Sequence, residues 1–288
     1  MSNEAPVWFQ DQWNSQVTLI YQQKGYMTQG MATGPTRVVG KQMHFPIAGK
    51  GQASVWTRGD EVKPMNATRG EVILSASEYD AGDYIYQYDL DRMAANELDT
   101  VHQTAAMALG RQHDQVLYNL MQATDFTTVP QFFGTYTGTP MTPEVILAAR
   151  RYLFNQDVPT EDGMLFCGLP PLAFDTMMQK NVFANGQWVG PNIPFGDGMR
   201  RRTWQNIHFF ELPVFLQSIT GNNNKCYMWH RSALGTGFTG EAVKSDFDKE
   251  VKSKRWWYQS TISAGACIIQ KNGIAELRFD GSVLPTYT

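Results

Sequence analysis

The stretch GKQMHFPIAGKGQASVWTRGDEV, residues 40–62, decides how this chain is interpreted. Its glycines and lysines suggest a phosphate-binding loop, in which glycines precede Lys and Ser/Thr between a buried strand and a helix. However, Gly49-Lys50-Gly51-Gln52 has no Ser or Thr after its lysine, and Gly40-Lys41 is followed by Gln42 where the hydroxyl residue belongs. The next residues, 53–57, have the composition of a strand and do not begin a helix. The pattern does not predict a phosphate site.

The flanking residues instead show the period of two that is typical of β-strands. The outgoing strand begins near Thr36, and the returning strand covers residues 69–76, with a glycine-rich, charged tip between them. One side of the outgoing strand carries Val39, Lys41, Met43, Phe45 and Ile47, and one side of the returning strand carries Val72, Leu74 and Ala76. An isolated two-stranded hairpin is only marginally stable in water, so something outside this arm must cover its apolar side.

The composition excludes some classes of function. Charged residues make up 18% of the 288 residues, against about 25% in an average protein, which indicates extensive contact with other chains. The net charge of -3 gives no basic surface for sequence-specific DNA binding.

Compartment signals are equally plain. The three cysteines are scattered in apolar runs, as expected of small buried side chains in a reducing compartment. No apolar run reaches the roughly 20 residues of a membrane helix. The first residues, MSNEAPVWFQDQW, lack the pattern of a signal peptide. We therefore expect a cytoplasmic protein without membrane association.

A long helix is predicted over residues 89–123. Apolar residues recur there at steps of three and four, which places them on one face of a helix. These residues are Leu90, Ala94, Leu98, Val101, Ala105, Ala108, Leu109, Val116 and Leu120. His102 and His113 lie on this helix too far apart to bind one ion, and we interpret them as solvated or interfacial.

The rest of the chain predicts a mixed α+β fold. Thr142-Pro143-Glu144 is typical of a helix start and introduces the segment EVILAARRYLF. Strands are predicted at 164–167, 203–212 and 226–230, and a helix at 171–178. The last strands, 260–269 and 274–279, are predicted to form a hairpin through Lys271-Asn272-Gly273. Arg58-Gly59-Asp60 is interpreted as a charged turn.

No motif predicts a metal site, a cofactor site or catalysis. HExxH, CxxC and GxSxG are absent, and the histidines outside the long helix have no ligand-forming neighbours at the required spacing. A catalytic triad assembled from distant residues stays open at this point.

The order of these elements resembles the major capsid proteins of tailed double-stranded-DNA bacteriophages, with the Hong Kong 97 type fold. The resemblance covers almost the whole chain. It is carried by VVGKQMHFPIAGKGQASVWTRGDEV at 38–62, by the segment from EVILSASEYD to QVLYNLM at 71–121, and by VPTEDGMLFCGLPP at 158–171. These motifs determine shape and carry no chemistry.

The resemblance implies a division of the chain into five parts. These are an N-terminal arm (1–35), an extended loop (36–80), a peripheral domain with the spine helix (81–141), an axial domain (142–250), and return strands of the peripheral domain (251–288). It also implies contacts between subunits. In the loop we expect them at Met43, Phe45, Ile47, Lys50, Val55, Trp56, Arg58, Asp60, Glu61 and Lys63, and in the arm at Trp8, Phe9 and Trp13.

The implied function is a capsid shell with no enzymatic activity and no cofactor. Copies of the chain would form pentamers and hexamers in the host cytoplasm and close into an icosahedral virion shell, in non-specific contact with packaged DNA. The length suggests a separate scaffolding protein or a processed product, and a portal is implied as well. Two alternatives stay open: an encapsulin-like nanocompartment, and a cytosolic phosphate-binding enzyme that uses Gly49-Lys50-Gly51.

Overall fold

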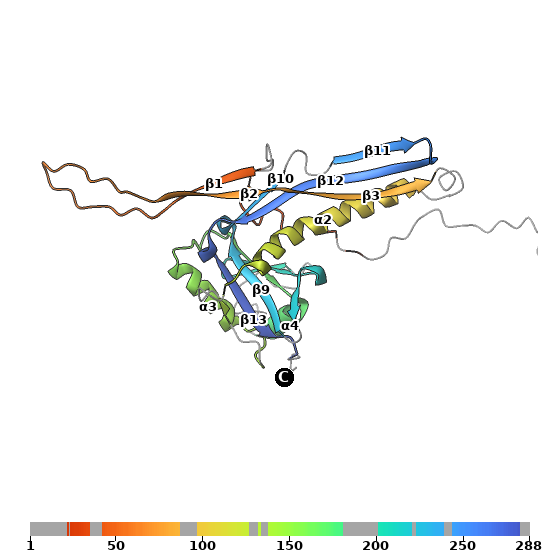
Figure 1. Ribbon diagram of the computed structural model, residues 1–288. Helices are drawn as coiled ribbons and strands as arrows, with labels where there is room; N and C mark the ends of the chain where they lie inside the picture. The colour runs from red at the N-terminus through yellow and green to blue at the C-terminus, as the bar shows by residue number, and fades with distance from the viewer. Residues whose placement is uncertain are drawn as a thin grey trace, which may run out of the picture.

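The computed structural model describes residues 22, 24–34, 42–86, 97–126, 132–133, 138–180, 201–220, 223–238 and 244–282. Figure 1 shows three parts: a long arm, an upper sheet that lies along helix α2, and a lower body built around a second sheet. The three N-terminal arm residues predicted as contacts, Trp8, Phe9 and Trp13, lie outside the described residues.

The arm consists of two antiparallel strands, β1 (Gln42–Ala48) and β2 (Arg69–Ser75). The predicted alternation is confirmed, because Phe45 and Leu74 are buried while His44 and Ile73 on the opposite side are exposed. After Ala76 the chain continues as β3 (Ser77–Tyr86). One extended run of backbone therefore links the arm to the upper sheet (Figure 1).

The upper sheet is organised around β12 (Arg255–Ile268), its central strand. β3 pairs with one edge of β12 through residues 255–264. β11 (Lys244–Glu250) and β10 (Leu234–Phe238) pair with the other edge, one after the other. Because the strands alternate their side chains, one face of β12 buries Tyr258, Ser260, Ile262 and Ala264.

Helix α2 (Glu97–Ala123) packs against the buried face of β12. Its end at Ala123 confirms the prediction, whereas the predicted start at Asp89 lies outside the described residues. The predicted apolar stripe is present, but the buried face of the helix is wider than the prediction. Ala105 and Leu109 are buried as expected, and the second half of the helix also buries Leu117, Tyr118 and Met121.

One prediction for α2 is wrong. His113 is neither solvated nor at a surface, because its side chain is only 5% exposed and lies between Asp114 and the ring of Tyr26. His102, by contrast, is exposed and has its ring edge-on to Tyr258 at 5.7 Å between centroids.

The lower sheet has the order β4-β13-β9-β5-β7-β6, with β8 also paired to β9. Strands β5 (Leu165–Leu169) and β9 (Asn223–His230) are central and are buried over most of their length. The remaining strands are β4 (Phe132–Phe133), β6 (Arg201–Trp204), β7 (Ile207–Glu211), β8 (Ser218–Thr220) and β13 (Ile274–Asp280).

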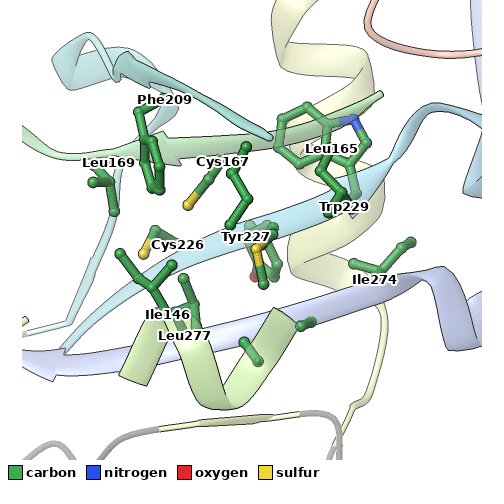
Figure 2. Packing of buried hydrophobic residues seen from close by; sticks show 14 of the residues in the cluster. Ile146, Leu165, Cys167, Leu169, Phe209, Cys226, Tyr227, Trp229, Ile274 and Leu277 are labelled. Atoms are coloured by element: carbon green, nitrogen blue, oxygen red, sulfur yellow. The ribbon is translucent and has the colours of Figure 1, made fainter. Parts of the chain in front are cut away.

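Both faces of this sheet are covered, which explains its nearly continuous apolar strands. On one face, Tyr118 of α2 meets the rings of Tyr227 and Trp229 edge-on. On the other face, helix α3 (Pro143–Asn155) directs Ile146 toward Leu277 and Cys226 (Figure 2). The main hydrophobic core lies here, and it joins the second half of α2 to the lower body.

The sequence signals for helix starts predicted both α3 and α4 in the lower body. α3 begins at Pro143 after the cap residue Thr142, as predicted, and α4 occupies Pro171–Met178, the predicted range. Three short 3-10 turns complete the described elements: η1 (Val214–Leu216), η2 (Arg231–Ala233) and η3 (Lys271–Gly273).

Residues 203–212 do not form a single strand. They contain the end of β6, a two-residue turn at Gln205-Asn206, and β7, with Trp204 paired to Ile207. Both turn residues have positive φ, 53° and 60°, which is the geometry of a type I′ hairpin.

The predicted hairpin of the last two strands is also wrong. β12 belongs to the upper sheet and β13 to the lower sheet, where β13 pairs with β9. The Lys271-Asn272-Gly273 segment is the 3-10 turn that carries the chain from one sheet to the other. Of the predicted return strands, residues 251–288, β12 therefore lies in the sheet that packs on α2 and β13 in the other sheet.

The predicted axial range, 142–250, likewise contains strands of both sheets. Its last strands, β10 and β11, lie in the upper sheet with β3 and β12. The chain thus crosses between the sheets at η2, after β9, and again at η3, after β12. Local strand patterns do not encode which sheet a strand joins.

Candidate functional site: the extended arm

The arm extends away from the body (Figure 1) and carries most of the predicted contact residues. Pairing between β1 and β2 runs from Gln42↔Ser75 to Ala48↔Arg69, and the Gly49 amide adds a hydrogen bond to the Thr68 carbonyl at 2.7 Å. Beyond this point the two limbs separate into a long loop that ends far from the body (Figure 1).

The root of the arm is covered by the chain itself. Phe45 is 7% exposed and Leu74 0% exposed, because both pack with Cys267 of β12 in a small separate core. A Cβ atom on Gly235 would lie 2.8 Å from the Phe45 ring, so β10 also touches it. The expectation that a neighbouring copy must cover Phe45 is therefore wrong.

The two other predicted apolar residues of β1 are intermediate. Met43 packs against the edge of this small core and is partly buried, and Ile47 is partly buried as well. The requirement that something outside the arm cover its apolar side is met here by β10 and β12. These two strands cover only the root of the arm and leave its tip exposed.

The tip of the arm, residues 50–66, is exposed at every position. Four large apolar side chains stand in water there: Val55 (95% exposed), Trp56 (57%), Val62 (84%) and Met65 (62%). Burying such side chains is favourable by about 1.5 to 3 kcal/mol each. Covering these four side chains with a partner surface would therefore be favourable.

A defined turn presents Trp56. The Asp60 amide donates to the Thr57 carbonyl at 3.0 Å, and the Trp56 Nε1–H donates to the Asp60 carbonyl at 2.7 Å. Gly59 has φ of 103°, a conformation that L-residues rarely adopt. The interpretation of Arg58-Gly59-Asp60 as a charged turn is confirmed.

The predicted charged residues of the arm fall into two groups. Lys50 forms an ion pair with Asp157, just beyond the end of α3, so its charge is engaged within its own chain. Arg58, Asp60, Glu61 and Lys63 are exposed on the tip. Any ion pairs among exposed charges contribute little to stability, so these four charged side chains are available to a partner.

A second exposed group of large side chains lies at the far end of the upper sheet. Phe247 (45% exposed) stacks on Trp256 at 4.7 Å between centroids, with Lys249 above the Trp256 ring. On the opposite face of the sheet, Arg255 lies 3.8 Å above the ring of Tyr84 (44% exposed). In Figure 1 this end points away from the arm.

The Gly49-Lys50-Gly51 segment is not built like a phosphate site. It follows β1, leads into the exposed tip and precedes no helix, so helix amides cannot converge on an anion there. Its lysine is paired with Asp157. Among the described residues, no group of three or more His, Cys, Asp or Glu side chains could hold a metal ion.

One cluster in the lower body has the residue types of a catalytic triad. His230 Nε2 lies 2.9 Å from Asp162 Oδ2, and its Nδ1 lies 2.7 Å from the Ser232 hydroxyl. The same Nδ1 also accepts the Ser232 backbone N–H, which makes His230 the N-terminal cap of η2. The cluster therefore has a structural role in the described geometry.

A connection between the N-terminal segment and α2 could not be found from the sequence. Asp114 is fully buried and accepts three hydrogen bonds from Met27 and Thr28. An aspartate beside a histidine on a helix gave no signal, because its partners are 86 and 87 residues away.

Within the described ranges, no helix combines the length and apolar character needed to cross a membrane.

The described chain is an α+β fold with an extended arm whose tip exposes large apolar side chains. Comparison with known proteins identifies its class. The phage capsid protein family model matches residues 5–281, and the chain belongs to this family. It is thus a protein of the phage capsid shell, and the family match favours this function over the encapsulin-like alternative.

Solved capsid structures share the fold at low sequence identity. The cyanophage Pam1 capsid aligns with a TM-score of 0.75 and 8% identity, over 97% of this chain and 98% of the other. The capsid of a native GTA particle aligns with a TM-score of 0.71 and 10% identity, over 95% of this chain and 96% of the other. The cyanophage P-SCSP1u capsid aligns with a TM-score of 0.70 and 14% identity, over 96% of this chain and 94% of the other. No curated protein gave a significant match.

These findings confirm the predicted α+β capsid fold of the Hong Kong 97 type and the predicted phage capsid family.

Proposed function

We propose that the protein is the major capsid subunit, and that its copies associate as pentamers and hexamers into an icosahedral shell around double-stranded DNA. The observation that carries this proposal is the arm. Its root is covered by its own chain. Its tip carries four large apolar side chains whose exposed fractions range from 57% to 95%. A surface of this kind favours association over existence as a monomer.

The arm contacts a neighbouring copy through its tip. The tip residues that we assign to this contact are Val55, Trp56, Arg58, Asp60, Glu61 and Lys63, with Met43 and Ile47 nearer the root. The N-terminal residues Trp8, Phe9 and Trp13 are assigned to a second contact between subunits. The GTA capsid, a structural relative, was computed with C5 symmetry, which is consistent with pentamers.

The molecule offers two different surfaces at opposite ends, the arm tip and the far end of the upper sheet (Figure 1). A contact between unlike surfaces continues from copy to copy and closes into a ring when the rotation allows it. In this proposal the lower body is the axial domain and the upper sheet with α2 is the peripheral domain.

The remaining partners follow from the same function. We assign a separate scaffolding protein and a portal to assembly, which takes place in the host cytoplasm, and we assign no enzymatic activity to the chain. The net charge of -3 suits a shell whose lining must release its genome, because a strongly basic lining would bind DNA tightly.

Electron microscopy and sizing chromatography of the expressed protein test this proposal. We expect closed particles of megadalton mass, alone or with the scaffolding protein. A variant with Val55→Ser, Trp56→Ser and Val62→Ser should stay monomeric. The control is Ile73→Ser, which alters an exposed apolar residue (47%) near the root and should still assemble. A small homogeneous wild-type monomer under varied salt and with scaffold would contradict the proposal.

A further inference from the structure

Asp114 lies on α2 as a fully buried carboxylate, and most of its partners come from one distant segment. Its Oδ2 accepts the Met27 amide at 2.9 Å, and its Oδ1 accepts the Thr28 amide at 3.0 Å and the Thr28 hydroxyl at 2.7 Å. His113 Nδ1 lies 3.2 Å from Oδ1. A buried carboxylate is tolerated only when donors of this kind satisfy it.

Residues 24–34, here called the strap, lie against α2 with unusually close backbone contact. The Tyr26 amide donates to the Gly110 carbonyl at 3.2 Å. A Cβ on Gly110 would lie 2.3 Å from the Lys24 carbonyl oxygen, and a Cβ on Gly25 2.0 Å from Gly110. Glycine at both positions is therefore what allows the strap to reach Asp114.

The strap continues from α2 to both sheets. The Trp229 Nε1–H of β9 donates to the Met31 carbonyl at 2.9 Å. Thr33 then joins β10, since its amide donates to Leu234 and its carbonyl accepts from Thr236, each at 2.8 Å. At its other end, Arg111 Nη1 donates to Gln22 Oε1 at 3.0 Å. The strap thus connects the spine helix, β9 and β10.

We propose that Asp114 is the positioning residue for the N-terminal arm. By holding Met27 and Thr28, it fixes the strap on α2, and with it the point of the fold to which the N-terminal residues are joined. This inference rests on the proposed function, in which the N-terminal arm contacts other subunits. Among the described residues, the carboxylate is the point where three of the strap's donors converge.

Amide hydrogen exchange on the unassembled protein tests the first part. In Asp114→Asn, exchange at Met27 and Thr28 should accelerate by roughly 10- to 100-fold, because hydrogen bonds to a charged acceptor are lost. The amides of β13 should keep their protection. Thr28→Val should accelerate exchange less, and Thr28→Ser, which keeps the hydroxyl, should not. The control is Asp99→Asn, an exposed carboxylate on the same helix.

Two results would overturn the inference. One is unchanged protection at Met27 and Thr28 in both Asp114→Asn and Thr28→Val. The other is an equal loss of protection in β13, which would make Asp114 a general determinant of folding. If Asp114→Asn does not fold, the Thr28→Val and Thr28→Ser pair decides between these outcomes.

Electron microscopy of the same variants tests the second part. A loosened strap should reduce the yield of closed particles at least tenfold relative to Asp99→Asn. Normal particles from a variant with a loosened strap would overturn the positioning role and leave the proposed function intact. If wild-type protein forms no particles, the proposed function fails, while the exchange data still decide whether Asp114 holds the strap.

Discussion

Leu74 and Ile73 are neighbours on the arm, yet they have opposite environments. Leu74 is 0% exposed and fills the small core with Phe45 and Cys267, whereas Ile73 is 47% exposed. Leu74→Ala should destabilise the chain by about 2 to 5 kcal/mol, because it removes buried contacts and leaves a cavity. Ile73→Ala should change stability by less than about 0.5 kcal/mol.

Urea unfolding followed by circular dichroism measures both variants. Equal effects would mean that the root of the arm is not covered by β10 and β12 in the isolated chain.

The pH dependence of the strap follows from Asp114. Burial pushes the pKa of its carboxyl upward, but hydrogen bonds from His113, Met27 and Thr28 outweigh burial and hold the pKa below its usual 3.8. A carboxyl with a lowered pKa stabilises the folded state above the unfolded pKa, and this contribution is lost as pH falls through the folded value. Tyr26 and Tyr118 also face Asp114, and both stay neutral in this range because their pKa values are raised.

We therefore expect wild type to have a higher unfolding temperature than Asp114→Asn by a constant margin from pH 5 to 7, and a margin that shrinks below about pH 4. Calorimetry across this range checks the sign. A margin that grew on acidification would contradict it.

The cysteines give a third prediction at this scale. Burial raises the pKa of the Cys167 and Cys226 thiols far above the usual 9.0 and that of Cys267 to about 11. The thiolate is the reactive form, so the folded protein should not react with a disulfide reagent at pH 8. Denaturation should release three reactive thiols. Fast labelling of any of the three before denaturation would show that its site is open.

At the scale of single elements, the β6–β7 turn has a residue pair that does not suit its geometry. Gln205 and Asn206 both have positive φ, where type I′ turns favour Asn followed by Gly. The double substitution Gln205→Asn and Asn206→Gly should stabilise the protein by about 0.5 to 1 kcal/mol, because both new residues tolerate positive φ better. Thermal unfolding measures the gain. The opposite change, Asn206→Val, places a β-branched residue at positive φ and should destabilise.

The elements show how far local sequence signals extend. Helices α3 and α4 were predictable because proline and capping residues mark their starts, and the alternation in β1 and β2 gave the arm. The β6–β7 turn was missed because Gln-Asn is not a typical hairpin pair. The separation of β12 from β13 was missed because Asn-Gly occurs both in hairpins and, here, in the turn between sheets.

The exposure of the predicted contact residues followed from the sequence in part. Val55 and Trp56 are exposed as the sequence suggested, but Phe45 is covered by β10 and β12, which lie about 190 to 220 residues later in the sequence. The proposed role of Asp114 depends on partners 86 and 87 residues away, which no local pattern reveals. Alternation predicts which side of a strand is apolar, and only the tertiary structure shows what covers it.

At the scale of the whole molecule, folding and assembly should be separable. The tip buries none of its residues in the body, so replacing residues 51–66 with Asn-Gly should leave the unfolding temperature within about 2 °C of wild type. The same variant should form no closed particles, because the apolar contact surface is gone. Calorimetry and sedimentation velocity measure the two effects. A fall of more than about 5 °C would mean that the tip folds onto the body.

The continuous run from β2 into β3 has a mechanical consequence. Any pull that a neighbouring molecule exerts on the end of the arm is transmitted along the backbone into β3, whose residues 77–86 pair with 255–264 of β12. Such a force acts parallel to these strands and loads the whole ladder of hydrogen bonds together, where a perpendicular force would break them one at a time. The protein should therefore resist tension along the arm far better than bending across it.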